Sequence, residues 1–347
     1  MLGVLHLHPV RCDFQTQRCL ELLLKSLGPE ISMTTSSFGP GGDFGNLPVA
    51  GFRLHYSGLA HTHIAHAWGP AELVAAAGAG FSRIIFSPQG LIHPKWLRWI
   101  DASFSLREVE IVCPTSALRD FFISRGAPAG RCRVISPAVD VSRFNGSRDK
   151  LRASLGLADS DMVLLAPGES IREVFHKHSM WAAAILHVLD PQWRFLIWGR
   201  GPMVDSLKRF AATVERDSLL VDAEKRLGRP VEFEQIASVA DAALVFADSM
   251  APVLPLSTCM AAGVPIVAAE TAGSREFLQD GITGFLEPSA TPRKLAQRML
   301  ALQKDPALRR KIAEAARIQA IDRFSVARNV ADWRRVYSDL GESTAFG

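Results

Sequence analysis

The sequence lacks the features that would place it among disulfide-rich, metal-held or membrane-spanning proteins. Its five cysteines are odd in number and scattered, and none forms a C-x-x-C pair, which argues against a disulfide framework or a structural zinc site. No apolar run approaches the roughly 18 residues of a membrane span. The opening MLGVLHLHPVRC has no long apolar core followed by a small-residue cleavage site, so it predicts a first strand and not a signal peptide. We therefore expect a cytoplasmic protein without a metal site.

Several catalytic and binding motifs are also missing. The chain contains no G-x-G-x-x-G, no G-K-[ST] phosphate loop, no G-x-S-x-G and no H-E-x-x-H. Their absence argues against dehydrogenase, kinase, serine hydrolase and zinc protease functions. The formal net charge of +4 is small for 347 residues, and no basic stripe interleaved with aromatics is present. We expect no nucleic-acid partner.

What is present is a regular alternation of short apolar strands and amphipathic helices. Strand-like GVLHLHPV, SRIIFSPQG and VEIVCPTS alternate with helix-like TQRCLELLLKSLG, PAELVAAAGAG and SALRDFFISRG. This rhythm predicts parallel sheets covered by helices on both faces. It breaks at the polar, turn-rich segment from Asp140 to Asp161, which we interpret as a linker, and then resumes. The length and the break predict two α/β domains.

The order of the later motifs resembles a known family. CRVISPAVDVSRF precedes the linker, LIWGRGP follows a strand, and LPLSTCMAAGVPIVAAETAGSREFLQDGITGFLEP closes the series. Together they resemble the retaining GT-B glycosyltransferases of family 4 (glycosyl transferases group 1). The resemblance covers essentially the whole chain and is strongest from Arg133 to Pro288.

That resemblance implies a GT-B fold, an α/β architecture of two Rossmann-like parallel-sheet domains facing across a cleft. Residues 1–145 would form the acceptor-side domain and residues 146–325 the nucleotide-sugar donor-side domain. Residues 326–347 would form a closing helix that packs back on the first domain. The donor would be a nucleotide-diphosphate sugar, UDP-, GDP- or ADP-linked, with no tightly bound cofactor.

The same resemblance assigns donor-side residues. Arg172 and Lys177 match the spacing of the cationic pair that neutralises the donor phosphates and the leaving diphosphate, although Glu169 stands where the family's arginine usually follows the glycine. The remaining candidates for nucleotide binding are two glycines of GRGP, a run at a helix start whose amides could bind a diphosphate, and a later glycine: Gly199, Gly201, Ser257, Thr258, Cys259 and Gly273.

Other positions depart from the family pattern. The usual Glu-x7-Glu pair is replaced by Met250 and Thr258, counted without a gap. Gln89 stands where many members have a histidine near the reacting sugar, and the neighbouring His93 could substitute for it. The loop HPVRCDFQTQR lacks the usual glycine pair, and its candidates for acceptor contacts are Arg11, Asp13, Gln15 and Thr16. We list Arg172, Lys177, Gln89 and His93 as candidate catalytic residues.

Two functions from different classes remain. The first is a glycosyltransferase, of hexosyltransferase type, that moves a sugar with retention to a hydroxyl of a glycan, a lipid or a small molecule. The second is a catalytically inactive GT-B relative that binds nucleotide, glycan or a partner protein, as the four departures together would suggest. A GT-B enzyme that does not transfer, such as a nucleotide-sugar epimerase, is a further alternative. The retained polar and glycine positions favour the transferase.

The segment HPKWLRWIDASF bears on the acceptor. Its cations and tryptophans suit an interfacial helix for a lipid-linked acceptor, at the inner face of a membrane. A core helix whose Lys and Arg side chains snorkel to solvent would show the same pattern. We expect the core helix, and peripheral membrane association stays open.

Overall fold

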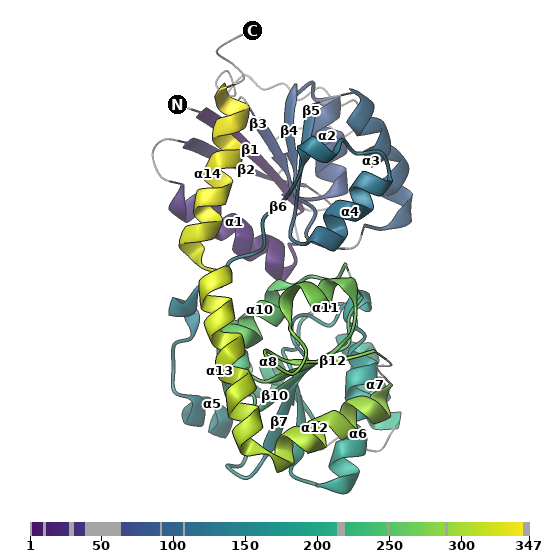
Figure 1. Cartoon of the computed structure of the whole chain (residues 1–347), viewed down its shortest axis with the longest axis vertical. Helices are drawn as coiled ribbons and strands as arrows, with labels where there is room; N and C mark the ends of the chain where they lie inside the picture. The colour runs from purple at the N-terminus through teal and green to yellow at the C-terminus, as the bar shows by residue number, and fades with distance from the viewer. Residues whose placement is uncertain are drawn as a thin grey trace. The chain divides into compact units, whose positions relative to one another are not determined.

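A computed structural model describes residues 2–9, 12–27, 31–38, 64–90, 92–106, 108–213, 219–248, 250–288 and 291–342, with the backbone alone at 105, 106 and 342. The chain divides into two compact units (Figure 1). The first unit contains residues 1–138 and 326–347, and the second contains residues 139–325. The division thus falls at Ala138–Val139, while the last helix belongs with the first unit. The segment that we expected to be a linker lies within the second unit.

The first unit is built on a parallel sheet with the strand order β2-β1-β3-β4-β5-β6. Its strands are β1 (Leu2–Pro9), β2 (Ile31–Phe38), β3 (Ile64–Ala67), β4 (Arg83–Phe86), β5 (Glu108–Cys113) and β6 (Cys132–Val134). Its helices are α1 (Phe14–Ser26), α2 (Pro70–Gly78), α3 (Pro94–Leu106), α4 (Ser116–Ser124), the 3₁₀ turn η2 (Ala129–Arg131) and α14 (Val326–Glu342).

Helix α14 is part of the core of the first unit. It buries Val330, Trp333, Tyr337 and Leu340, at the i, i+3, i+7 and i+10 positions of one helix face. They pack in one cluster with residues of α1 and of the sheet. The side chain of Asn329 also donates to the Ser136 carbonyl at 2.8 Å. One amphipathic helix near the end of the sequence thus completes the core of a unit that is otherwise formed by residues 1–138.

The second unit has a parallel sheet with the order β12-β11-β10-β7-β8-β9. Its strands are β7 (Met162–Leu165), β8 (Trp193–Ile197), β9 (Leu220–Asp222), β10 (Ala242–Val245), β11 (Ile266–Ala269) and β12 (Phe285–Glu287). Its helices are α5 (Arg148–Ser154), α6 (His176–Leu189), α7 (Val204–Thr213), α8 (Ala223–Leu227), α9 (Phe233–Val239), α10 (Leu254–Ala261), α11 (Ala272–Phe277), α12 (Pro292–Lys304) and α13 (Pro306–Arg323), with 3₁₀ turns η3 (Val141–Arg143) and η4 (Arg172–Val174).

This strand order is that of a doubly wound sheet. The chain runs outward from β7 to β8 and β9, then returns to the other side of β7 with β10. Strands β7, β10 and β11 are largely buried, and their sequences MVLL, AALV and IVAA are continuous apolar runs, as expected for strands that helices cover on both faces. The reversal between β7 and β10 is the point where such sheets bind ligands, beyond the carboxyl ends of the strands.

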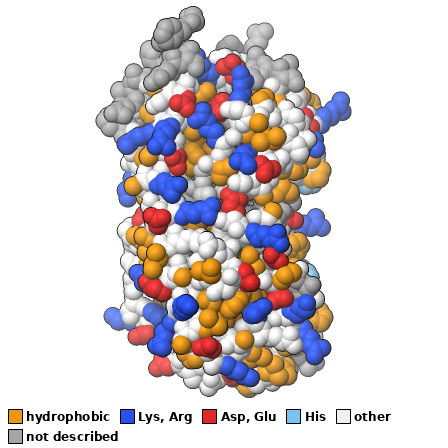
Figure 2. Space-filling view, in the orientation of Figure 1, with side chains coloured by type: hydrophobic (Ala, Val, Ile, Leu, Met, Phe, Trp, Pro, Cys, Tyr) orange, Lys and Arg blue, Asp and Glu red, His pale blue; other side chains and the backbone are white. Residues whose placement is uncertain are grey.

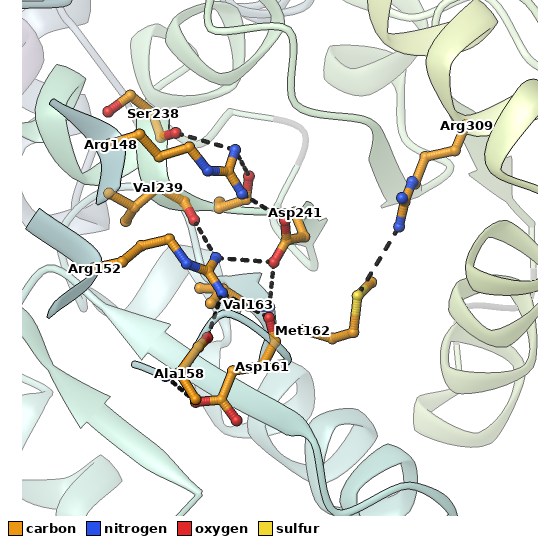
Figure 3. A network of polar contacts seen from close by, with 11 residues as sticks. Arg148, Arg152, Ala158, Asp161, Met162, Val163, Ser238, Val239, Asp241 and Arg309 are labelled. Atoms are coloured by element: carbon orange, nitrogen blue, oxygen red, sulfur yellow. Dashed lines mark hydrogen bonds and ion pairs between the residues drawn. The ribbon is translucent and has the colours of Figure 1, made fainter. Parts of the chain in front are cut away.

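A buried arginine fixes the expected linker to the second unit (Figure 3). Arg152 of α5 is 5% exposed. Its guanidinium donates to the Val239 and Asp161 carbonyls at 3.0 and 2.7 Å and to the Asp241 carboxylate at 3.1 Å. Arg148, one turn earlier, reaches the other oxygen of Asp241 at 2.6 Å. The segment is polar because it supplies this network, not because it is a loose connection.

Candidate functional site

Four loops meet at the carboxyl edge of the second sheet. They follow β7, β8, β10 and β11, the strands on either side of the topological reversal. The Ser170 amide donates to the Arg200 carbonyl at 2.7 Å, and the Met203 amide donates to the Ser170 carbonyl at 2.8 Å. The Asp248 amide donates to the Glu173 carbonyl, also at 2.8 Å. These backbone bonds join the loop after β7 to the loops after β8 and β10.

Two predicted glycines allow this close approach. Gly201 has φ +105°, and a Cβ added there would lie 2.6 Å from the Ser170 carbonyl oxygen. Gly199 has φ +101°, and its added Cβ would lie 2.2 Å from Oδ1 of Asp222. Both positions therefore need glycine for the left-handed backbone and for space. Both glycines shape the backbone of the site, and their contact with a nucleotide stays a prediction.

Arg172 and Lys177 lie on the wall of one pocket beside this turn. The pocket has a volume of about 210 Å³. Its lining is Ser170, Ile171, Arg172, Phe175, His176, Lys177, His178, Met203 and Leu207. Both cations are exposed, and neither has an ion-pair partner among the described residues. The lining contributes two positive charges and, in the described part of the chain, no carboxylate.

His176 holds the loop that carries these cations. It is 5% exposed. Its Nδ1 lies 2.9 Å from the Ser170 hydroxyl, and its Nε2 lies 3.3 Å from the Pro167 carbonyl. Because a carbonyl only accepts, the proton is on Nε2 and the Ser170 hydroxyl donates to Nδ1. Burial lowers the pKa of His176 to about 4, so the ring is neutral near pH 7 and acts as a structural link.

The residue before it, Phe175, is the one non-glycine residue with positive φ that the described chain shows, with φ 39° and ψ 42°. A side chain in this left-handed region costs about 1–2 kcal/mol. The Phe175 ring packs edge-on to Phe246 at 6.0 Å, and His178 stacks on Phe246 at 4.8 Å. Strain of this kind is concentrated at functional loops, and here it directs the chain from Arg172 into the first turn of α6.

The predicted residues of α10 are buried. Ser257, Thr258 and Cys259 are at most 1% exposed. The Thr258 hydroxyl donates to the Leu254 carbonyl at 2.7 Å, and the Ser257 hydroxyl does so at 3.1 Å. The Ser257 amide is bonded to the Val253 carbonyl at 3.1 Å. A ligand at this helix start would therefore meet the chain before Ser257, and direct contacts by the three predicted residues stay a prediction.

The start of α10 nevertheless lies within the loop cluster. A Cβ added to Gly168, in the loop after β7, would lie 2.7 Å from Cγ of Pro255. A smaller pocket of about 30 Å³ is lined by residues that include Asp248, Val253 and Gly273. Met250 follows in the same loop, and its amide donates to Oδ1 of Asp248 at 3.0 Å. Gly273 thus shares a pocket with the loop after β10.

In the first unit, Gln89 is a buried junction. It is 8% exposed. Gln15 donates to both the backbone and the side-chain oxygen of Gln89 at 3.0 Å, and the side-chain amide of Gln89 donates to the Ser87 carbonyl at 3.1 Å.

The other predicted residues of the first unit lie at helix starts or outside the described residues. His93 is exposed, and its Nδ1 accepts from the Lys95 amide at 3.2 Å at the start of α3. Asp13 caps α1 through the Thr16 amide at 2.9 Å, and Arg11 lies outside the described residues.

Two ionisable side chains of the first unit are buried, which the sequence did not predict. Glu72, in the first turn of α2, is 3% exposed, and burial raises its pKa to about 7. His66 is fully buried between the Tyr337 hydroxyl at 2.7 Å and the Ser87 hydroxyl at 2.8 Å. Burial follows from the packing of distant elements, so a residue-by-residue pattern does not reveal it.

Helix α3 departs from the expected core helix at Trp99. Trp99 is 59% exposed, and Lys95 and Arg98 are exposed beside it. Only part of the helix faces inward, with Ile100 fully buried. Within the described ranges, no helix has both the length and the apolar character to cross a membrane. On the face that Figure 2 shows, cationic and anionic side chains are interspersed without a continuous basic stripe.

Residues 147–319, which make up most of the second unit, match the family model described as glycosyl transferases group 1. This unit is a glycosyl transferases group 1 domain. The loop cluster, with Arg172, Lys177, Gly199 and Gly201, lies inside the matched stretch of this domain.

Curated relatives agree with this assignment. D-inositol 3-phosphate glycosyltransferase 1 of Catenulispora acidiphila is 32% identical over 195 residues, which cover 52% of this chain and 46% of that protein. N-acetyl-alpha-D-glucosaminyl L-malate synthase of Bacillus anthracis is 23% identical over 197 residues, covering 57% and 50%. The chain thus spans about half the length of the curated relatives that it matches.

Solved structures confirm the predicted fold over the whole chain. Anabaena HepE, in complex with UDP and glucose, superposes with a TM-score of 0.80 at 18% identity, covering 98% of this chain and 100% of that one. Sucrose-phosphate synthase from Thermosynechococcus elongatus gives a TM-score of 0.77 at 15% identity, covering 99% and 100%. The fold is GT-B, with two Rossmann-like parallel-sheet units.

Proposed function

We propose that the chain is a glycosyltransferase that moves a sugar from a nucleotide-diphosphate donor to a hydroxyl of a glycan, a lipid or a small molecule. The observation that carries the proposal is the position of Arg172 and Lys177 on one pocket wall beside the glycine turn. Retention of the anomeric configuration and a hexosyl donor belong to the proposal, because the sequence resembles retaining enzymes. Residues 1–145 would serve the acceptor and residues 146–325 the donor.

The electrostatics of the pocket suit a diphosphate. A diphosphate leaving group gains negative charge as the bond to the sugar breaks. Two cations without described ion-pair partners would stabilise that charge more in the transition state than in the ground state. A carboxylate in the lining would oppose this, and the described lining contains none. The start of α10 adds the positive end of a helix dipole to the same cluster.

We propose UDP as the first nucleotide to test, because Anabaena HepE is described in complexes with UDP and with UDP-glucose. GDP and ADP are the alternatives. No other cofactor is proposed. The glycine turn would let the backbone approach the nucleotide, and Gln89 and His93 remain candidates for contacts with the sugar or the acceptor.

The test is calorimetric titration of the full chain with UDP, GDP and ADP, followed by product analysis with the radiolabelled sugar nucleotide that binds. We expect Arg172→Ala with Lys177→Ala to weaken nucleotide binding by about a hundredfold, at ~1.5 kcal/mol for each charged contact. The control is Arg293→Ala with Lys294→Ala, which removes two exposed cations from α12 of the same unit.

Each outcome has a distinct meaning. Micromolar binding that depends on the first pair and not on the control pair, together with sugar transfer, would support the proposal. Binding without transfer to water or to any hydroxyl acceptor would favour the catalytically inactive alternative. No binding of the three nucleotides to folded protein would refute the donor site.

A further inference from the structure

One stripe of exposed side chains on α3 has an unusual composition. Lys95, Arg98, Trp99 and Ala102 are all exposed, and their spacing of three, four and seven residues places them on one face of the helix. Trp99, at 59%, is the most exposed tryptophan that the structure describes. The adjoining side of the helix packs inward through Ile100 and Ser103, at 0% and 5%. The stripe is thus a surface feature of a helix that is otherwise held by the first unit.

The cations of this stripe are available for a partner. In the described part of the chain, Lys95 and Arg98 have no ion pair, and the Lys95 ammonium lies 5.5 Å from the Trp96 ring centroid. Three acidic side chains of α3 and of the two elements that follow it in the chain are paired. Asp101 of α3 is bound by Arg125, Asp120 of α4 pairs with Arg119 at 2.7 Å, and Glu108 of β5 pairs with Arg131 at 3.2 Å. The stripe itself carries the two positive charges of Lys95 and Arg98 and no carboxylate.

We propose that the α3 stripe, Lys95, Arg98, Trp99 and Ala102, is a docking surface for an anionic lipid bilayer. Tryptophan prefers the interface between headgroups and acyl chains, because its ring is apolar and its N–H is polar. Lys and Arg beside it attract anionic headgroups, and each contributes at short range. The helix is already formed and anchored, so that docking requires no coupled folding. The proposed docking surface contains none of the donor-site residues, so its test is independent of the proposed transferase function.

A second exposed apolar surface helps to define the test. Helix α6 exposes Trp181, Val188 and Leu189 at 54%, 64% and 62%. It is more apolar than the α3 stripe, and Lys177 at its start lines the candidate donor pocket. If exposed tryptophan alone caused membrane binding, Trp181 would serve as well as Trp99. The two sites therefore separate general hydrophobicity from the combination of tryptophan and cations.

The experiment is flotation of the full chain with vesicles of phosphatidylcholine, with and without phosphatidylglycerol, at low and high NaCl. We expect binding to the phosphatidylglycerol vesicles that weakens with salt. Lys95→Gln with Arg98→Gln should lower the partition coefficient by about 25-fold, or about fivefold per charge. Trp99→Ala should lower it by about tenfold. All these side chains are exposed, so the variants should keep the wild-type thermal transition.

The controls are Trp181→Ala and the double variant Arg293→Gln with Lys294→Gln, which should bind as the wild type does. The proposal would be overturned if folded wild-type protein does not bind the anionic vesicles, or binds phosphatidylcholine equally well. It would also be overturned if the α3 variants bind normally, or if Trp181→Ala abolishes binding while Trp99→Ala does not. Nucleotide titration of the α3 variants should be unchanged, which keeps this result independent of the donor site.

Discussion

At the scale of single residues, the candidate site depends on where a side chain is absent. Gly201 and Ser170 are in such close contact that a methyl group would not fit between the two backbones. The turn GRGP was identified in the sequence by its resemblance to the family's turn, and its glycines were expected to let the backbone approach a ligand. That Gly201 also approaches Ser170 could not be predicted, since Ser170 lies in a different loop.

We predict that Gly201→Ala lowers stability by about 2 kcal/mol or more and UDP affinity by at least tenfold. About 1 kcal/mol of this comes from the left-handed backbone, and the rest comes from displacing the loop that carries Arg172. The control is Gly228→Ala in the same unit, which has φ +64° and no neighbour within 4 Å of an added Cβ. It should lose about 1 kcal/mol and bind normally. Equal effects of both substitutions on UDP affinity would contradict the role given to Ser170.

At the scale of elements, α5 shows how a polar segment can be structural. From sequence, its charges indicated a linker. In the structure, Arg152 satisfies three carbonyls that precede strands or end turns, together with the Asp241 carboxylate. Asp241 in turn accepts from the Val163 amide at 2.9 Å at the start of β7. The helix, the sheet and the turn are thus joined at one guanidinium.

We predict that Arg152→Met destabilises the second unit by about 3–5 kcal/mol, because it removes one of the two guanidinium partners of Asp241 and leaves three carbonyls without their donor. The measurement is denaturant unfolding followed by circular dichroism. Arg148→Met is the matched control. Arg148 binds the same carboxylate but its side chain is 45% exposed, so its loss should cost less than about 1 kcal/mol. A similar loss from both variants would show that burial of Arg152 does not determine its contribution.

Element by element, prediction from sequence succeeded for the apolar strands of the sheet interiors. SRIIFSPQG contains β4, and VEIVCPTS contains β5 except for its first residue. It missed β2, whose sequence ISMTTSSF is largely polar, and the three-residue β9. β2 is a strand because it pairs along its whole length with β1, and this partner lies outside the local pattern. The exposure of Trp99 was missed for the same reason, since amphipathic periodicity does not say which neighbour covers each face.

At the scale of the whole molecule, buried ionisable groups set the pH dependence of stability. Burial lowers the pKa of His6 to about 3, of His176 to about 4, and of His66 well below its usual value. These rings are neutral in the folded protein and bind protons more readily when unfolded. Their contribution is fully present above about pH 6.5 and is lost as the pH falls toward the folded pKa values.

We predict that the free energy of unfolding decreases as the pH is lowered from 6.5 to 4, by up to ~1.4 kcal/mol per pH unit for each ring. The measurement is the thermal transition temperature, which should fall over the same pH range. Glu72 works in the opposite direction. Its raised pKa of about 7 means that its charged form is disfavoured by folding, so stability is lost as the pH rises from 4.5 to 7. Glu72→Gln should therefore raise the transition temperature at pH 8 and leave it nearly unchanged at pH 4. A transition temperature that is independent of pH between 4 and 6.5 would contradict burial of the histidines.

The sequence by itself determined the class of the molecule: two series of alternating strands and helices, and an ordered series of glycine and cation motifs. These are local properties, since they follow from periodicity and from residue types that the backbone or the chemistry requires. Only the tertiary structure decided that β10 returns to the side of β7, which brings the loop of Arg172 against the loop of Asp248. It also decided that Thr258 is buried and Trp99 is exposed. The physical reason is that pairing of strands and covering of helix faces involve partners far apart in the chain, and no local pattern specifies them.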